Sequence, residues 1–468
     1  MAELLQRPLS DVCRLLERRE LSAVELMQAT LARIDALNPT LNAFVAFRER
    51  EQLLADASAA DVRLARGEAR PLEGIPLGVK DLENAAGLVT SEGSVPFKDN
   101  LVEHDSVQVS RLRAAGAIVV GKTNAPEFGY TAITKNLLFG VTRNPWNLER
   151  TPGGSSGGSS AAIAGGLIPL ATASDGGGSV RLPASMTGCF GLKVSYGRIP
   201  HESKGLWDTG DTSVHGPLTR SVEDAALHLD MTVGAHPLDP NSLPHPGLSY
   251  RAILDELPSG LRVGWSPDLG FAVVQSDIGE VAYDAARVFE ELGLRFDELK
   301  TGLPALGFDW GLMNAFEMLG RLAPLLPEHE HEFGRAFLKG TLAGRRMTPE
   351  LFGDLRRRRE LLNRWCADAF ERFDLLLTPT MPFDPPPAAG PFPAETEGRK
   401  QPAASAGSFT IPFNLSWHPA ASVRAGFSRA GLPVGLQIVG PRHRDDLVLQ
   451  AARAFEQARP WQTDWPAL

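Results

Sequence analysis

Two glycine–serine runs embedded in apolar sequence constrain this chain more than any other feature. Residues 151–160 read TPGGSSGGSS and continue into AAIAGGLIPLA, and residues 174–179 read SDGGGS and continue into VRLPASMTGCFGLK. A flexible linker separates folded units and has no reason to run directly into buried sequence. Glycines inside core material instead indicate backbone that approaches another group closely or adopts a positive φ. The runs are therefore predicted to be loops of one site, for either phosphate binding or catalysis.

The residues favour catalysis over phosphate binding. A phosphate-binding P-loop has the pattern GxxxxGK[ST], and no such lysine follows Gly158. A catalytic serine needs a base that takes its proton and backbone N–H donors where the oxyanion forms. The three glycines before Ser179 allow consecutive N–H groups to converge on one point. Composition leaves the base open among lysine, histidine and carboxylates, because none of the ten histidines is tied by a motif to either run.

The remainder of the chain alternates between short apolar runs and helical patterns. Such alternation predicts an α/β protein with a large, mixed, twisted β-sheet covered by helices on both faces. Strands are expected at 75–81, 117–122, 261–266, 374–380 and 431–440. Helices are expected at 21–39, with a capping box at Ser22 and Glu25 and an end at Pro39, and at 105–115, 274–294, 349–372 and 445–458.

One domain over residues 1–468 is expected, with a more variable middle section at about 235–345. The segment 382–404 carries too many prolines for a central strand and is interpreted as a surface loop.

Charge and cysteine content narrow the functional classes. The net charge of −9 argues against a nucleic-acid or anionic-membrane surface. The cysteines at 13, 189 and 366 form no CxxC pair and no metal-ligand spacing, so reduced, buried thiols are expected, with no metal and no cofactor. No signal peptide and no apolar stretch long enough to span a membrane is evident, which predicts a cytoplasmic protein.

Several motifs in order resemble the amidase signature family, and the overall pattern is similar to bacterial amidases of the nylon-oligomer type. The motifs are GIPLGVKD (74–81), GKTNAPEFGY (121–130), GGSSGGSSAAIA (153–164), DGGGSVRLPA (175–184), GCFGLK (188–193), HGPLTRSVEDAALHLDMTVG (215–234), DLLLTPT (374–380) and GLPVGLQIVG (431–440). The resemblance spans nearly the whole chain and implies the amidase signature fold.

Matched residue by residue, the resemblance implies a catalytic triad of Lys80, Ser155 and Ser179. Ser179 matches the nucleophile, Ser155 the bridging serine with a cis peptide bond, and Lys80 the buried base. The implied oxyanion hole is formed by the amides around Gly176, Gly177 and Gly178, and the expected substrate contacts are Gly129, Tyr130, Thr131 and Trp207. Gly176 stands where the family commonly has a larger residue, which predicts a wider acyl pocket.

The chemistry that this resemblance implies is consistent with the residues around the lysine. Lys80 can act as a base only when neutral, and its apolar surroundings favour the neutral form. Asp81 would oppose this, but strand alternation is expected to point it away. The expected reaction is cleavage of the C–N bond of a small amide, anilide, cyclic amide or carbamate through an acyl-enzyme on Ser179.

Two other functions stay open at this point. The first is the glutaminase subunit of an amidotransferase acting on misacylated tRNA, which shares every motif above. The second is a non-catalytic binding protein on the same scaffold. The expected partners are a small-molecule substrate and, if the chain self-associates, a second copy in a homodimer; no nucleic acid and no membrane are expected.

Overall fold

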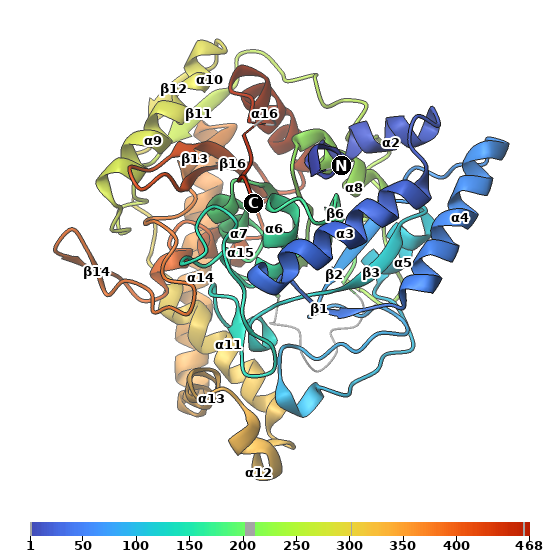
Figure 1. Cartoon of the computed structure of the whole chain (residues 1–468). Helices are drawn as coiled ribbons and strands as arrows, with labels where there is room; N and C mark the ends of the chain where they lie inside the picture. Colours follow the sequence, from blue (N-terminus) through green and yellow to red (C-terminus); the bar gives the residue numbers. More distant parts are fainter. Residues whose placement is uncertain (1, 202–210, 301, 462–463) are drawn as a thin grey trace.

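The protein is built around one large mixed β-sheet (Figure 1). The computed structural model describes residues 2–201, 211–300, 302–461 and 464–468. The sheet has eleven strands in the order β1-β3-β2-β6-β10-β8-β16-β17-β13-β11-β12. Their bounds are β1 (Phe44–Phe47), β2 (Pro76–Lys80), β3 (Ile118–Thr123), β6 (Leu170–Ala171), β8 (Phe190–Lys193), β10 (Leu218–Thr219), β11 (Arg262–Trp265), β12 (Arg295–Glu298), β13 (Leu375–Pro379), β16 (Ala420–Phe427) and β17 (Pro433–Val439).

Pairing within the sheet is antiparallel through its centre and between the edge strand β1 and β3, and it is parallel on either side of the centre. β2 pairs in parallel with β3 and β6, and β11 pairs in parallel with β12 and β13. β6, β10, β8, β16, β17 and β13 form consecutive antiparallel pairs. This pattern confirms the predicted mixed sheet.

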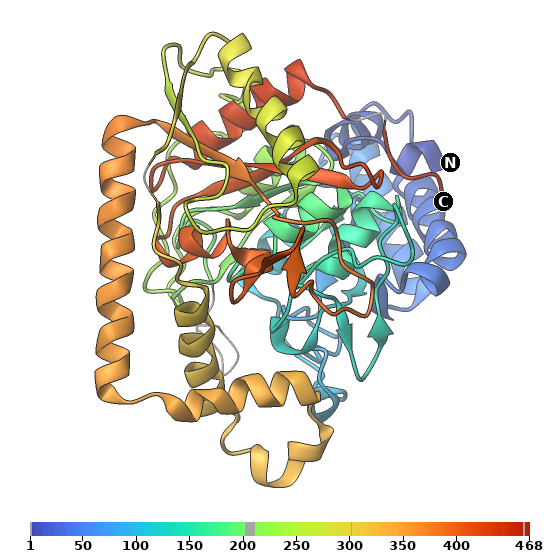
Figure 2. The same ribbon diagram turned by 90° about the vertical axis from the view of Figure 1, so that its left-hand side faces the viewer.

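Helices cover the sheet on both faces. Figure 2 shows the red α16 (Asp445–Ala458) and the yellow-green α9 (Ser276–Ala286) on one side of the orange strands, and the green α6 (Gly157–Ala164) and α7 (Arg181–Thr187) on the other. Every residue of α6 and α7 is buried. The small side chains that follow the first glycine–serine run therefore allow a helix to lie in the centre of the molecule, against β2, β3 and β6.

Most expected elements are present, but two helix predictions differ from the structure: the helix expected at 274–294 is two helices, α9 and α10 (Val288–Glu291), and the first long helix has a different end. The five expected strands correspond to β2, β3, β11, β13 and β17, and α14 (Pro349–Arg372) and α16 have the expected ends. α3 (Ala23–Leu41) begins with the predicted capping box, but it continues past Pro39 to a left-handed cap at Asn42. A proline late in a helix removes only one backbone hydrogen bond, and the amide of Asn42 still bonds to the carbonyl of Asn38 at 2.8 Å.

The middle section at about 235–345 and the first part of the proline-rich segment 382–404 both contribute to the folded core of the protein. β11 and β12 complete one end of the sheet. α11 (Gly307–Leu322), α12 (Leu326–His329), α13 (Arg335–Leu342) and the long α14 form a separate group of helices along one side and the lower end of the molecule in Figure 2. The first part of 382–404 is not a surface loop, because Phe383 is buried in an apolar cluster with Leu182; only its later part, with β14 (Glu395–Thr396) and β15 (Arg399–Lys400), is mostly exposed.

Among the described residues, no helix combines the length and apolar character needed to cross a membrane. The three cysteines are free and buried, as predicted.

Candidate active site

The two glycine–serine runs lie next to each other in the structure. Ser155 follows a cis peptide bond from Gly154 and precedes α6, and Ser179 precedes α7. The amide of Ser156 donates a hydrogen bond to the carbonyl oxygen of Ser179 at 3.3 Å. The ends of two central helices thus bring the two candidate serines to one place, as predicted for loops of a single site.

Lys80 lies at the end of β2 and reaches this place from the sheet. Its Nζ is 2.7 Å from Ser155 Oγ and 2.9 Å from Ser174 Oγ. The side chain is almost fully buried. Burial lowers the pKa of Lys80 to about 7, although the carboxylates of Asp175, Glu83 and Glu92 act in the opposite direction. Near neutral pH, Lys80 therefore exists in comparable amounts as the charged and the neutral amine.

Asp81 points away from Lys80, as strand alternation predicts. Its carboxylate accepts hydrogen bonds from the amides of Ser91, at 3.1 Å, and Gly93, at 3.3 Å. The Ser91 hydroxyl also contacts it. This loop holds the aspartate on the other side of the strand, so Asp81 does not form an ion pair that would keep Lys80 charged.

Ser179 is partly buried and lines a cavity together with Ser155. Its hydroxyl has no hydrogen-bond partner among the described residues. In the absence of substrate, catalytic hydrogen bonds are often long or unformed, so this geometry is compatible with a nucleophile.

Hydrogen bonds to two of its carbonyl oxygens hold the backbone before Ser179 in place. Trp310 Nε1 donates to the carbonyl of Gly176 at 2.9 Å, and Thr410 Oγ1 donates to the carbonyl of Gly177 at 2.7 Å. Because the N–H and C=O of a trans peptide point in opposite directions, these contacts orient the following amides. The amides of Gly176, Gly177 and Ser179 have no acceptor within the described part of the chain, so they are available as oxyanion donors.

Gly178 was also predicted as an oxyanion donor, but its amide already has an acceptor. Its amide donates to Asp175 Oδ1 at 2.7 Å and is therefore already occupied. Its φ of 134° and the closeness of Thr410 Oγ1, 2.4 Å from an added Cβ, explain why glycine stands there. The prediction of Gly178 as a donor was wrong, because the amide stabilises the loop instead.

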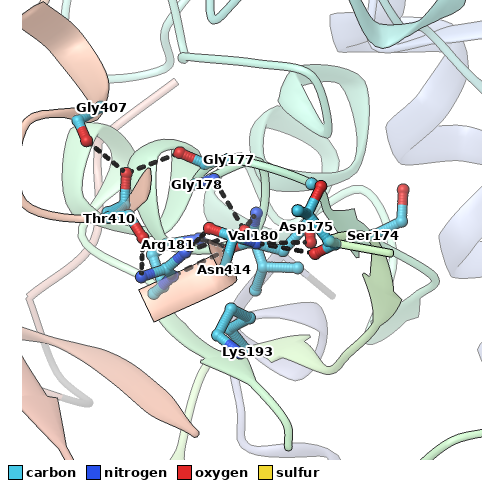
Figure 3. Close-up of polar contacts among 12 residues, drawn as sticks. Ser174, Asp175, Gly177, Gly178, Val180, Arg181, Lys193, Gly407, Thr410 and Asn414 are labelled. Carbon is cyan, nitrogen blue, oxygen red and sulfur yellow. Dashed lines mark hydrogen bonds and ion pairs between the residues drawn. The ribbon is translucent and has the colours of Figure 1, made fainter. Parts of the chain in front are cut away.

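Asp175 and Arg181 form a buried ion pair behind the loop that precedes Ser179 (Figure 3). Arg181 Nη2 is 2.9 Å from Asp175 Oδ1, and both side chains are fully buried. Asn414 Nδ2 donates to the same carboxylate at 2.9 Å. Burial alone would raise the pKa of Asp175, but the Arg181 charge and these hydrogen bonds outweigh it and hold the pKa well below its usual range. The ion pair thus fixes the loop that precedes Ser179.

Replacing Asp175 with asparagine is expected to lower the free energy of unfolding by about 3–5 kcal/mol, because it leaves the Arg181 charge buried and unpaired. Denaturant unfolding followed by circular dichroism measures this change. The matched control is Glu290→Gln, which breaks an exposed pair with Arg287 and is expected to have no measurable effect. Equal unfolding midpoints for the two variants would contradict the structural role of the buried pair.

A cavity of about 1050 Å³ opens onto the two serines. This volume is at the upper end of the range for small-molecule sites. The predicted contacts Gly129, Tyr130 and Thr131 line it, whereas Trp207 lies outside the described residues. Tyr130 is 45% exposed and packs edge-on against Phe337 of α13.

The cavity wall contains two kinds of surface. One set of lining residues is apolar, and half of those named here come from α11 and α13 of the middle section; the set includes Phe128, Leu182, Trp310, Met318, Phe337 and Ile411. Another part carries ionisable groups; its residues include Glu83, Glu92, His104, Asp105, His201 and His215.

Sequence reasoning missed four residues of the site. Ser174 is a second hydroxyl partner of Lys80, and Trp310 holds the Gly176 carbonyl. The indole also lies where a Cβ on Gly177 would be, 2.5 Å from its Cζ2, which explains why glycine stands at that position. Glu92 and His215 line the cavity. Ser174 begins the second glycine–serine run and His215 begins the motif at 215–234. No local signal identifies Glu92, or Trp310, which comes from the variable section.

Comparisons with known proteins agree with this geometry. The Amidase family model matches residues 25–449. An acylamidase from Rhodococcus erythropolis is 39% identical over 464 residues, covering 96% of this chain and 94% of its own. A glutamyl-tRNA(Gln) amidotransferase subunit from Roseiflexus sp. (strain RS-1) is 34% identical over 506 residues, covering 100% of this chain and 99% of its own.

Solved structures show the same relationship. A bacterial aryl acylamidase of the amidase signature family has a TM-score of 0.92 at 31% identity, covering 98% of this chain and 97% of its own. A 6-aminohexanoate cyclic dimer hydrolase complexed with substrate has a TM-score of 0.88 at 30% identity, covering 99% of each chain. The chain therefore belongs to the amidase signature family and is a hydrolase acting on carbon–nitrogen bonds.

Proposed function

We propose that this protein is a serine amidohydrolase that cleaves the C–N bond of a small amide, anilide, cyclic amide or carbamate. The observation that carries the proposal is the 2.7 Å contact between the buried Lys80 Nζ and Ser155 Oγ, beside a cavity that Ser179 also lines. A lysine held partly neutral beside a hydroxyl is the arrangement that a proton relay to a serine nucleophile needs.

The proposed reaction proceeds through an acyl-enzyme. Ser179 Oγ attacks the carbonyl carbon while its proton moves to Ser155 Oγ, and the Ser155 proton moves to neutral Lys80 Nζ. The amides of Gly176, Gly177 and Ser179 are the donors proposed to stabilise the oxyanion. The relay then returns a proton through Ser155 to the leaving nitrogen, and the C–N bond breaks. Water hydrolyses the Ser179 ester by the same route and regenerates the enzyme.

The direct test is a screen of purified protein against aryl amides, alkyl amides, cyclic amides, carbamates and glutamine, with release of the amine as the readout. Hydrolysis of at least one amide class by the wild type is expected, and it should persist in the presence of a metal chelator. Absence of turnover on every class, with no acylation of the protein in mass spectra, would overturn the proposal.

The pH dependence of catalysis is expected to follow Lys80. Only the neutral amine accepts a proton, so kcat/KM should rise with pH through the pKa of about 7 and level off above it. Below this pKa, activity is expected to fall about tenfold per pH unit as the lysine becomes charged. Initial rates on a pH-stable amide measure this profile, and enzyme returned from low pH to pH 8 should recover full activity. A flat profile across pH 7 would contradict the role of Lys80.

Glutaminase activity within an amidotransferase is the second candidate, favoured by the 34% identity to the Roseiflexus amidotransferase subunit over nearly the whole length of both chains. One feature of the cavity disfavours glutamine. Among the described residues that line it, the only guanidinium is that of Arg111, and this donates to the carbonyls of Thr232, Gly234 and Ala235. It is therefore committed elsewhere and is not available for the α-carboxylate of glutamine. Ammonia release from glutamine by the purified chain would reverse this preference.

A further inference from the structure

Glu92 is a buried acid that the proposed relay does not use. It lines the active-site cavity and is only 8% exposed. Its backbone is fixed on both sides, because its amide donates to the Asp81 carbonyl at 3.1 Å and its carbonyl accepts from the Phe128 amide at 2.8 Å. Its φ is 56°, a left-handed conformation that residues other than glycine rarely adopt. The backbone thus holds this carboxyl group at the cavity wall.

The Glu92 carboxyl group has no hydrogen-bond partner within the described part of the chain. Burial raises its pKa to about 8, and the nearby Asp81 adds to this, whereas Lys122 and Lys80 act in the opposite direction. Neither lysine is a full counterion, because burial also lowers the pKa of both. A buried acid without a partner is costly unless a ligand supplies one.

The other acids on this wall already have partners. Glu83 accepts from Ser106 Oγ at 2.6 Å and from Gln108 Nε2 at 3.0 Å. Asp105 accepts from the amide of Ala86 at 2.8 Å, and it also forms an ion pair with an arginine of α5 (Val107–Ala114) at 3.1 Å. Glu92 therefore differs from Glu83 and Asp105, because its carboxyl group has no hydrogen-bond partner among the described residues.

His215 is a second buried polar side chain that lines the cavity. It is 4% exposed and its ring stacks on that of His201, with the ring centroids 4.2 Å apart; its buried Nδ1 has no hydrogen-bond partner among the described residues and lies 3.7 Å from Glu83 Oε1. Its backbone pairs with Ser174, whose hydroxyl contacts Lys80. Burial lowers the pKa of His215 well below its usual value, so the ring is neutral and keeps one nitrogen as an acceptor.

These groups lie on the side of the site where the leaving amine is expected. The proposed relay returns its proton from Ser155, so the leaving nitrogen lies near Ser155 and Lys80. Glu92 is joined through its amide to Asp81, the residue after Lys80, and His215 is joined to Ser174. The apolar wall is then left for the acyl part of the substrate.

We propose that Glu92 is the counterion for a primary ammonium group on the amine part of the substrate. The substrate class is therefore amides formed between an apolar or aromatic acid and a diamine whose second amino group is free. This inference rests on the proposed amidohydrolase function.

The test compares two substrates of equal length, monobenzoylated diaminobutane and N-pentylbenzamide, in which a methyl group replaces the ammonium. The wild type is expected to prefer the ammonium substrate in kcat/KM by about 30-fold or more. In Glu92→Gln, which keeps the shape of the side chain and removes its charge, this preference should fall to within about threefold of parity. Glu92→Asp keeps the charge and should retain a measurable preference. The exposed acid Glu103, changed to glutamine, is the matched control and should leave the preference intact.

A binding measurement separates this proposal from the proposed reaction. In a Ser179→Ala background, which removes the nucleophile, calorimetry should show tighter binding of monobenzoylated diaminobutane than of N-pentylbenzamide, and Glu92→Gln should remove that difference. Equal affinities for the two amides, or equal losses on both in Glu92→Gln, would overturn the ammonium site. Equal hydrolysis of both amides by the wild type would contradict the ammonium site and support the amidohydrolase function. Tighter binding of the ammonium substrate without any turnover would support the ammonium site and contradict the amidohydrolase function.

Discussion

Replacing Ser179 with alanine is expected to lower kcat by about a millionfold, because removal of a serine nucleophile leaves only binding and oxyanion stabilisation. The fold should be unaffected, since the Ser179 hydroxyl has no hydrogen-bond partner among the described residues. Amine release from the best amide of the screen, followed over hours at high enzyme concentration, measures the residual rate.

Covalent labelling provides the control for this prediction. A fluorophosphonate should add one adduct to the wild type, located on the peptide that contains Ser179, and none to Ser179→Ala. Ser58→Ala, on the exposed side of α4 (Arg50–Arg66), should retain full labelling and turnover. Labelling at another serine, or turnover above about one thousandth of the wild-type rate in Ser179→Ala, would exclude Ser179 as the nucleophile.

Replacing Lys80 with methionine is expected to lower kcat/KM by about 10³–10⁴-fold, the usual contribution of a general base. Methionine has nearly the shape of lysine and removes an amine whose burial is unfavourable when charged. The unfolding midpoint should therefore be unchanged or higher. Activity assays and denaturant unfolding on the same preparation separate catalysis from stability.

Lys122 is the matched control for Lys80. It is equally buried, lies on the neighbouring strand β3, and contacts Thr90 Oγ1 at 3.0 Å and the carbonyl oxygen of Glu83 rather than Ser155 or Ser179. Lys122→Met is expected to lose less than about tenfold in activity. Retention of more than a tenth of wild-type kcat/KM in Lys80→Met, or an equal loss in both variants, would show that the relay does not start at Lys80.

The parts of the fold that could be predicted are those with strong local signals. β2 and β3 are short, buried apolar runs, and α14 and α16 have regular helical spacing. β16, an eight-residue strand in the centre of the sheet, was not predicted. Its sequence, AASVRAGF, mixes small, polar and charged residues, and its strand conformation depends on pairing with β8 and β17 on either side. Tertiary context, rather than local propensity, explains this strand.

The residues proposed to carry the reaction could be named from the sequence because each stands in a motif with its own backbone requirement. Lys80 follows a buried strand, and Ser155 and Ser179 stand beside glycines that permit close backbone approach. The substrate cavity was not recognisable in the same way. Trp310 contacts Gly176 across 134 positions, and the partners of Arg181 include Asn414, 233 positions away. Contacts at such separations leave no local pattern, because they depend on how helices and strands pack.

The sequence by itself thus determined the reaction class and the residues proposed to carry it, since glycines, hydroxyls and a buried lysine impose their chemistry locally. Only the tertiary structure decided which amides of the loop before Ser179 lack an acceptor among the described residues and that the Gly178 amide is bound to Asp175. It also decided that Glu92 lines the cavity with no hydrogen-bond partner in the described part of the chain. Whether a polar group is occupied depends on every neighbour that packs around it. The presence or absence of a hydrogen-bond partner is therefore a property of the folded chain, and the proposed substrate preference is inferred from it.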